Sequence, residues 1–167
     1  FFRAVNRVGP SHIRVEADEV TYSLHVILRF RLEVALIGGE LEVREVPGAW
    51  RDMSRELLGI VPERDSDGAL QDVHWSFGGF GYFPTYALGN LYAAQLLEVI
   101  ERNMPNLWDG VAAGNTRPLL DWLRSNVHSA GSTRRARDLM RDVTGQPLGA
   151  ASFLSYLRNK YGEIYRL

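Results

Sequence analysis

The sequence predicts a mainly α-helical protein, a single domain over residues 1–167 with one small β element around Leu70–Trp75. Apolar residues recur every three or four positions through most of the chain, in runs that end at glycine or proline, and this spacing is typical of helices. Leu70–Trp75 instead alternates, which is the spacing of a short strand. With 46% hydrophobic residues, the chain is long enough for one globular core and short for two.

The N-terminal part predicts three helices. Residues 1–8 are expected to form the end of one, stopped by a Gly-Pro pair. Residues 13–37 predict one long amphipathic helix that ends at two glycines. A third is expected from Pro47 to Gly59. Polar residues at spacings of three and four form a stripe on the long helix, and such a stripe is usually solvated: Arg14, Asp18, Thr21, His25 and Arg29.

The remainder of the chain is also expected to be helical. Residues 59–69 are a polar loop and the best candidate for a mobile or cleavable segment. The later helical patterns cover residues 86–103, 118–131 and 151–165, and a further one is capped by Ser132 or Thr133 and stops at Gly145. Residues 106–114 predict a short helix or turn.

Residues 68–86 differ from the rest because glycines, aromatic rings and polar groups occur together without helical spacing. Alternation places Asp72 and His74 on one strand face, where a carboxylate and an imidazole can share a partner. The glycines let the backbone bend sharply or approach a ligand. The composition fits a cleft wall, and it fits equally an aromatic loop that fills a gap between helices.

Composition excludes several classes of function. The 19 basic and 20 acidic residues nearly cancel, so nothing indicates a nucleic-acid surface. There is no cysteine, which excludes disulfides, thiolate metal sites and cysteine nucleophiles. No signal-peptide or membrane-span pattern is present, and we expect a cytoplasmic protein. The chain begins at Phe1 without methionine, so we expect a part of something longer or a processed product.

Common catalytic motifs are absent. None of the four histidines is followed by glutamate, no two are spaced for a helical zinc site, and there is no phosphate-binding loop or nucleophile elbow. The remaining polar groups suit a charged ligand. Arg14 can bind a carboxylate, Asp18 can hold that arginine, and His74 with Tyr82 or Tyr86 can donate to an oxygen. Two of these assignments have a structural alternative. His74 can be a buried histidine with its hydrogen bonds satisfied, and Tyr82 and Tyr86 can be tyrosines whose rings only pack.

Two segments resemble a known family. Residues 13–18 match I-R-x-x-A-D and residues 68–75 match G-x-x-Q-D-x-H-W, the signatures of the Taq-type thermostable metallocarboxypeptidases. Residues 81–89 and the end of the chain are similar too. Phe77 and Gly79 depart from the family, which more often has a polar and a small hydroxyl residue there.

The resemblance covers only the C-terminal third of such an enzyme. The family's H-E-x-x-H zinc motif, its catalytic glutamate and its other signatures lie N-terminal to these segments, and none occurs in this sequence. The resemblance therefore implies a mainly helical fold, no cofactor held by this chain although the family uses zinc, and commonly homodimers that remove residues from peptide C-termini.

The resemblance also implies roles for single residues. Arg14 is the candidate for the substrate carboxylate, and His74 with Tyr82 or Tyr86 steadies the oxyanion. The residues that shape the site are Asp18, Gln71, Asp72 and Trp75. No residue is expected to bind metal.

Three functions follow as hypotheses. The preferred one is a carboxypeptidase-related protein that keeps the substrate-side wall and is inactive alone. The second is an interaction module that pairs with itself or regulates a full-length carboxypeptidase. The third is the C-terminal piece of an active zinc carboxypeptidase.

Overall fold

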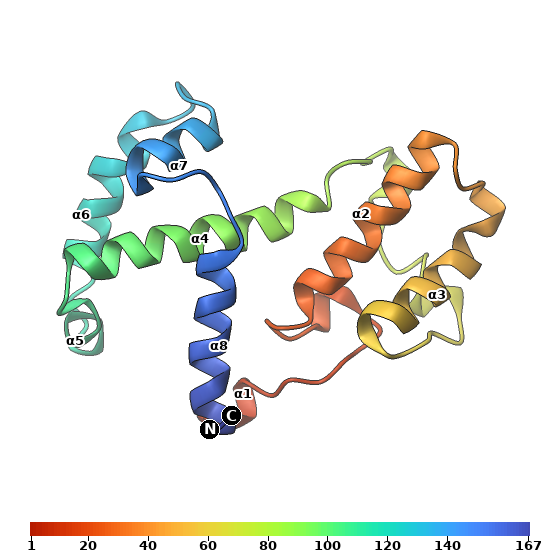
Figure 1. Ribbon diagram of the computed structural model, residues 1–167, viewed down its shortest axis with the longest axis horizontal. Helices are drawn as coiled ribbons and strands as arrows, with labels where there is room; N and C mark the ends of the chain where they lie inside the picture. Colours follow the sequence, from red (N-terminus) through yellow and green to blue (C-terminus); the bar gives the residue numbers. More distant parts are fainter. The chain divides into compact units, whose positions relative to one another are not determined.

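The computed structural model describes residues 1–167 and contains helices and no strands (Figure 1). The α-helices are α1 (Phe2–Val5), α2 (Tyr22–Gly38), α3 (Val46–Leu58), α4 (Pro84–Asn103), α5 (Leu107–Ala112), α6 (Arg117–Asn126), α7 (Ala136–Thr144) and α8 (Ala151–Tyr165). Short 3-10 helices are η1 (Arg14–Glu16), η2 (Val43–Glu45), η3 (Asp65–Asp67), η4 (Trp75–Phe77) and η5 (His128–Ala130). The predicted mainly helical fold is confirmed.

The chain divides into two compact units, Phe1–Leu88 and Gly89–Leu167, and α4 continues from the first into the second. The single domain expected over residues 1–167 stays a prediction. No helix has the length and hydrophobicity that crossing a membrane requires.

Unit 1 is built on α2 and α3, which lie side by side (Figure 1). Its core is Leu28, Leu32 and Trp50, with Met53 and Leu57 packed against it. Both helices end at a glycine in the left-handed conformation, Gly39 and Gly59, as the sequence predicted for their C-termini.

In unit 2, α4, α5, α7 and α8 contribute buried apolar residues, whereas α6 has none. The buried apolar residues are Ala94, Val99, Ile100, Leu107, Met140, Phe153, Tyr161 and Ile164. The Gln95 side chain, 3% exposed, donates to the Pro147 carbonyl at 3.0 Å and accepts a bond from the Gly149 backbone N–H at 3.4 Å. This amide therefore connects α4 to the segment between α7 and α8.

Two predicted elements are wrong. The small β element around Leu70–Trp75 is absent, and these residues form turns that lead into η4. The long helix over residues 13–37 is shorter: residues 14–16 form η1, and α2 begins only at Tyr22. In both places side chains bond to partners distant in the chain, and these bonds replace the regular backbone pattern expected from spacing.

The polar stripe predicted to be solvated is also wrong. His25 and Arg29 are 1% and 0% exposed, and Arg14 is 5% exposed. Apolar residues flank His25 and Arg29 on α2, so the polar groups lie on the buried side of the helix with their neighbours Val26, Leu28 and Leu32. A buried charge requires a partner, and that partner defines the site.

Candidate functional site

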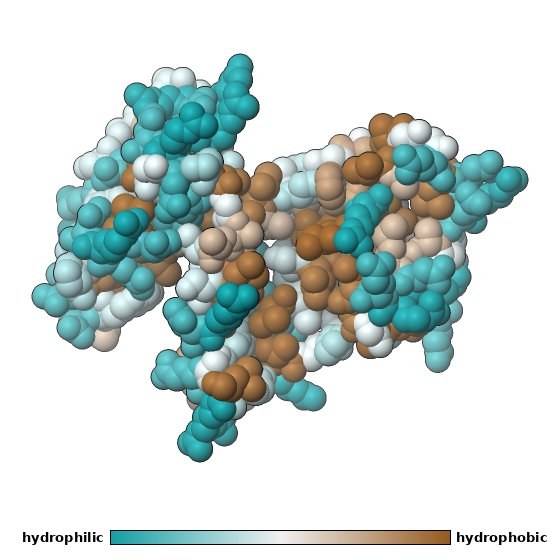
Figure 2. All heavy atoms as spheres, viewed as in Figure 1, coloured by the Kyte–Doolittle hydropathy of each residue, from teal (hydrophilic) through white to brown (hydrophobic).

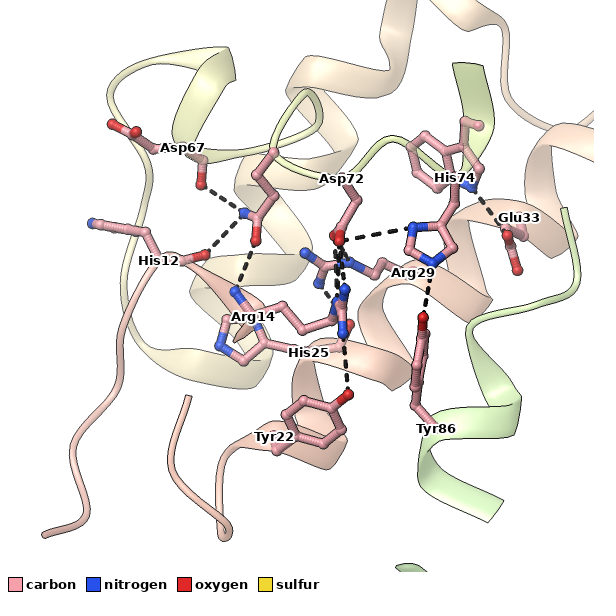
Figure 3. Close-up of polar contacts among 12 residues, drawn as sticks. His12, Arg14, Tyr22, His25, Arg29, Glu33, Asp67, Asp72, His74 and Tyr86 are labelled. Carbon is pink, nitrogen blue, oxygen red and sulfur yellow. Dashed lines mark hydrogen bonds and ion pairs between the residues drawn. The ribbon is translucent and has the colours of Figure 1, made fainter. Parts of the chain in front are cut away.

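Asp72 is the centre of a buried charge cluster in unit 1 (Figure 3). Its Oδ1 accepts from Arg14 Nη2 at 2.6 Å and from Arg14 Nε at 3.2 Å. Its Oδ2 accepts from Arg29 Nε at 2.6 Å. One carboxylate thus joins η1, α2 and the loop that precedes η4, although 58 and 43 residues separate it from its two partners.

The two guanidinium groups have further contacts that fix their orientation. Arg14 Nη1 donates to the Tyr22 hydroxyl at 3.0 Å, and Arg29 Nη1 donates to the His25 carbonyl at 2.8 Å. Arg29 also stacks on Trp50, with its guanidinium carbon 4.7 Å from the ring centroid. Planar guanidinium groups suit such buried pairs because they bind and stack at once.

The electrostatics of the cluster follow from burial and pairing. Burial alone raises the pKa of Asp72, but hydrogen bonds and charge from Arg14 and Arg29 outweigh it and hold that pKa below its ordinary value. For Arg29 burial dominates and lowers the pKa to about 10, with Asp72 opposing. The arginines therefore stay cationic and Asp72 anionic at neutral pH.

Gln71 fastens the same loop through its side-chain amide. Its Oε1 accepts the backbone N–H of Arg14 at 2.8 Å. Its Nε2 donates to the carbonyls of His12 and Asp67, both at 2.9 Å. Gln71 thus holds residues 12–14 against the turn at residues 67–71. Its side chain makes the backbone hydrogen bonds that a neighbouring strand would make in a sheet.

His74 lies between the charge cluster and the start of α4. Its Nε2 is 3.0 Å from the Tyr86 hydroxyl, and its Nδ1 is 3.9 Å from Asp72 Oδ1 (Figure 3). The Phe83 ring lies 4.3 Å from the imidazole, centroid to centroid. His74 is 8% exposed and its Nδ1 has no hydrogen-bond partner. The imidazole therefore pairs with Tyr86 through Nε2, while Nδ1 faces Asp72 beyond hydrogen-bond distance.

Trp75, the residue after His74, attaches the loop to α2. Its indole N–H donates to Glu33 Oε1 at 3.0 Å, and Glu33 is 3% exposed. The Trp75 ring stacks on Phe80 at 6.0 Å and meets Trp50 edge-on at 6.2 Å. Trp75 is therefore part of the core of unit 1 as well as of the loop.

Most of the predicted site residues come together. Arg14, Asp72, His74 and Tyr86 form one connected group, with Gln71 and Trp75 at its sides. The Tyr82 ring lies 5.7 Å from His74, and Tyr82 is 52% exposed.

Asp18 does not join Arg14. Its carboxylate accepts from the backbone N–H groups of Gly9, Val20 and Thr21 and from the Thr21 hydroxyl. Burial raises the pKa of Asp18, but these bonds outweigh it and lower the pKa overall. Asp18 therefore organises the turn before α2.

Tyr22, Arg29 and Glu33 also belong to this group of contacts, although the sequence prediction did not include them. A signal was available for Arg29, because His25, Arg29 and Glu33 recur every four residues on α2 with apolar residues on both sides. That pattern indicates a polar stripe inside the core, and such a stripe has to meet other polar groups.

Phe77 and Gly79, the two positions that depart from the resembled family, lie next to each other in space. A Cβ at Gly79 would lie 2.6 Å from Phe77 Cε2 and 3.0 Å from the His74 carbonyl oxygen. The Phe77 ring, 68% exposed, thus occupies the room that a side chain at Gly79 needs. Phe77 also lies 5.8 Å from the His74 ring, so the pair gives the neighbourhood of His74 a more apolar lining.

No group of three or more histidine, aspartate or glutamate side chains is placed to hold a metal ion. His74 faces a tyrosine and a carboxylate already bound by two arginines, and it is not accompanied by a second imidazole. These residues therefore do not fit a zinc ion.

Comparison with known proteins decides the family. The family model described as carboxypeptidase Taq (M32) metallopeptidase matches residues 1–161. The chain belongs to the M32 metallopeptidase family. It is 50% identical over 165 residues to thermostable carboxypeptidase 1 of Thermus thermophilus and 43% identical over 167 residues to carboxypeptidase 1 of Bacillus subtilis. It covers 32% and 33% of those two proteins, so it spans about a third of their length.

Solved M32 structures confirm the fold. The crystal structure of the M32 carboxypeptidase from Deinococcus radiodurans R1 superposes with a TM-score of 0.96 at 44% identity, covering 99% of this chain and 34% of that one. The Pyrococcus furiosus carboxypeptidase superposes with a TM-score of 0.92 at 39% identity, covering 94% and 32%. The chain corresponds to the C-terminal portion of an M32 carboxypeptidase, as the two signatures predicted.

Proposed function

We propose that these residues form the substrate-side wall of a metallocarboxypeptidase site, and that His74 and Tyr86 contact the oxygen of the scissile amide as its charge develops. The proposal combines membership in the M32 family with the geometry around His74. Its substrate is a peptide C-terminus.

The proposal depends on how the side chains of the signature at residues 68–75 are used. Of its four polar or aromatic side chains, three attach the loop to neighbouring segments. Gln71 binds backbone groups, Asp72 binds two arginines, and Trp75 binds Glu33. His74 instead pairs with the hydroxyl of Tyr86 at the start of α4, and the Tyr86 ring also lies 4.8 Å from the guanidinium carbon of Arg14. A loop fastened on both sides of one histidine is the arrangement expected when that histidine must be held in place.

The pair can supply a hydrogen-bond donor for an oxyanion. His74 Nε2 and the Tyr86 hydroxyl lie 3.0 Å apart, so the two polar groups are close enough to face one substrate oxygen. We propose that each donates a hydrogen bond to that oxygen when the substrate is bound. Fixed donors of this kind act where charge develops in the transition state. Tyr82, whose ring is 5.4 Å from that of Tyr86, is the second candidate donor.

Arg14 remains the proposed contact for the substrate carboxylate. A guanidinium has five N–H donors, and three donor bonds of Arg14 go to Asp72 and Tyr22. Two N–H groups remain for a ligand. Asp18 shapes this end of the wall indirectly, through the turn that follows η1.

We also propose that the 167 residues alone do not hydrolyse peptides. They contain no H-E-x-x-H sequence, and no group of acidic and histidine side chains fits a metal. The M32 family is zinc-dependent, so the metal-binding residues have to be supplied by other parts of an enzyme. Because the chain has no cysteine, it needs no oxidising compartment for disulfides, and we propose the cytoplasm.

A chimera tests the wall directly. The matching 165 residues of the Thermus thermophilus carboxypeptidase are replaced by this chain, which is 50% identical to them. The chimera is expected to bind zinc and to release C-terminal residues from a blocked peptide. His74→Gln and Tyr86→Phe in the chimera should each lower kcat about 100-fold. His128→Gln, at an exposed position in unit 2, is the matched control and should retain full activity.

The outcomes separate the hypotheses. An inactive chimera that folds and binds zinc contradicts the proposal that these residues form the substrate-side wall. Full activity of the His74→Gln chimera contradicts the role of the imidazole. The isolated 167 residues are assayed in parallel, and one zinc per chain with release of C-terminal residues would show that the predicted inactivity is wrong.

A second function, an interaction module, is favoured by the exposed side of α2. Ile27, Phe30, Val34 and Ile37 follow helical spacing and are 37%, 47%, 53% and 73% exposed. Hydrophobic side chains gather over α2 in Figure 2. Such a patch is typical of a surface that binds another protein chain. We propose self-association or pairing with a carboxypeptidase for it. A monomer at high concentration that binds no M32 enzyme contradicts this function.

A further inference from the structure

Helix α2 carries a row of buried polar residues that no family signature includes. His25, Arg29 and Glu33 are spaced four apart, so they lie on one side of the helix. They are 1%, 0% and 3% exposed. Their burial is unusual because arginine and glutamate are almost never fully buried unless they are paired.

Each of the two charged residues in this row holds one residue of the signature loop. Arg29 Nε donates to Asp72 Oδ2 at 2.6 Å, and Glu33 Oε1 accepts from Trp75 Nε1 at 3.0 Å. The spacing of four residues between Arg29 and Glu33 corresponds to about 6 Å along the helix. Helix α2 therefore holds the loop at two points, and His74 lies between them in sequence.

The backbone of this loop has little regular structure of its own. Only η4, three residues long, lies in it, and a turn closes where the Gly79 N–H donates to the His74 carbonyl at 2.7 Å. The location of the imidazole thus depends on side-chain fasteners at Asp72 and Trp75. Arg14 holds Asp72 from η1, whereas Arg29 and Glu33 hold the loop from a helix of 17 residues.

The two residues are also incompletely paired, which distinguishes them from residues kept for stability alone. Arg29 Nη2 and Glu33 Oε2 are buried without hydrogen-bond partners. Apolar side chains of similar volume often serve a core as well as buried charges do. The hydrogen bonds that the two residues do make go to the signature loop and, for Arg29, to the His25 carbonyl.

We propose that Arg29 and Glu33 are positioning residues that hold Asp72 and Trp75 on either side of His74, and so set where the imidazole meets the substrate. This inference rests on the proposed function for its catalytic consequence. Its structural content, the position of His74, can be measured independently of activity.

The experiment uses the natural protein, expressed from its own gene and labelled with 15N-tryptophan and 13C-histidine. The variants are Arg29→Lys, Arg29→Met and Glu33→Gln, and the His74 and Trp75 signals are assigned with His74→Gln and Trp75→Phe. Matched controls are Arg31→Met and Glu56→Gln, because this exposed pair joins the same helix to α3. Thermal unfolding shows which variants are folded.

Both Arg29 variants are expected to shift the His74 ring signals, Arg29→Lys less than Arg29→Met, because lysine keeps the charge and loses the planar donor. Glu33→Gln should shift the Trp75 indole N–H signal and speed its exchange with water. The controls should leave both signals unchanged. A merely structural role would lower the unfolding temperature and leave these signals of the folded protein in place, and that result overturns the inference. If Arg29→Met does not fold, Arg29→Lys and Glu33→Gln decide it.

The same substitutions in the chimera connect the position to catalysis. Arg29→Met and Glu33→Gln should lower kcat about 10- to 100-fold while KM changes less than threefold, since a displacement of about 1 Å has effects of this size. Shifted signals with unchanged kcat would uphold the positioning of His74 and contradict the proposed role of the imidazole. Unchanged signals would overturn the positioning itself, whatever the activity.

Discussion

Asp72→Asn is the most informative single substitution in unit 1. Asparagine has nearly the same shape, but it lacks the charge that the carboxylate shares between two guanidinium groups. The side chains of Arg29 and Arg14 are 0% and 7% exposed, so both cations would remain in a largely water-free environment without an anion. Removing one partner of a buried ion pair costs about 3–5 kcal/mol.

Urea denaturation measures the expected loss in free energy of unfolding, and thermal denaturation measures the matching fall in unfolding temperature. A loss of about 3–5 kcal/mol corresponds to an unfolding temperature about 6–20 °C lower for a chain of this size. Asp52→Asn is the control, because its ion pair with Arg55 is exposed and should contribute nothing measurable.

The dependence on pH gives a second readout. Because the pKa of Asp72 is lower in the folded state, the carboxylate contributes stability above its unfolded pKa of about 3.9. That stability is lost as the pH falls through the folded pKa. The variant should therefore lose less stability than the wild type below about pH 4. A variant within about 1 kcal/mol of wild type at pH 7, with the same acid profile, would refute the role of Asp72 as the shared anion of the two arginines.

Three further predictions concern other parts of the chain. Burial lowers the pKa of His25 to about 4, so the free energy of unfolding of the wild type should fall by up to about 3 kcal/mol as the pH is lowered from about 6.5 to 4. His25→Gln should flatten this decline, and parallel curves of stability against pH for the two proteins would contradict the prediction. Gly79→Ser should cost about 1 kcal/mol, and a double-mutant cycle with Phe77→Ala should show coupling above about 0.5 kcal/mol; additive effects would mean that the two positions are independent. Gln95→Leu leaves the Pro147 carbonyl without its donor and should cost about 1–3 kcal/mol by urea denaturation, whereas an unchanged midpoint would show that this bond is dispensable.

Local chemistry determined the helices that were predicted correctly. Helix α3 begins beside Pro47 and ends at Gly59, and α8 covers the 15 residues from Ala151 to Tyr165 that the apolar spacing indicated. Proline at a first turn and glycine past a last turn act on the backbone within a few residues. These helix ends can therefore be predicted from the sequence alone.

The two wrong elements share a different cause. Residues 13–21 have helical spacing and residues 70–75 alternate, yet neither forms the element expected. Asp18 closes the turn before α2. Bonds between the two segments, donated by the Arg14 N–H to Gln71 and by the Arg14 side chain to Asp72, determine the rest of their backbone. A spacing rule considers neighbours along the chain, and these partners are 57 and 58 residues apart.

The sequence by itself determined the helical class, most helix ends and, through two signatures, the M32 family. Only the tertiary structure decided which polar residues are buried and what they bind. Arg29 has the same spacing on α2 whether it faces water or Asp72, and the anion that compensates for its burial is a carboxylate 43 residues later in the chain. The site around His74 is therefore a property of packing, because each of its fasteners joins segments that no local pattern connects.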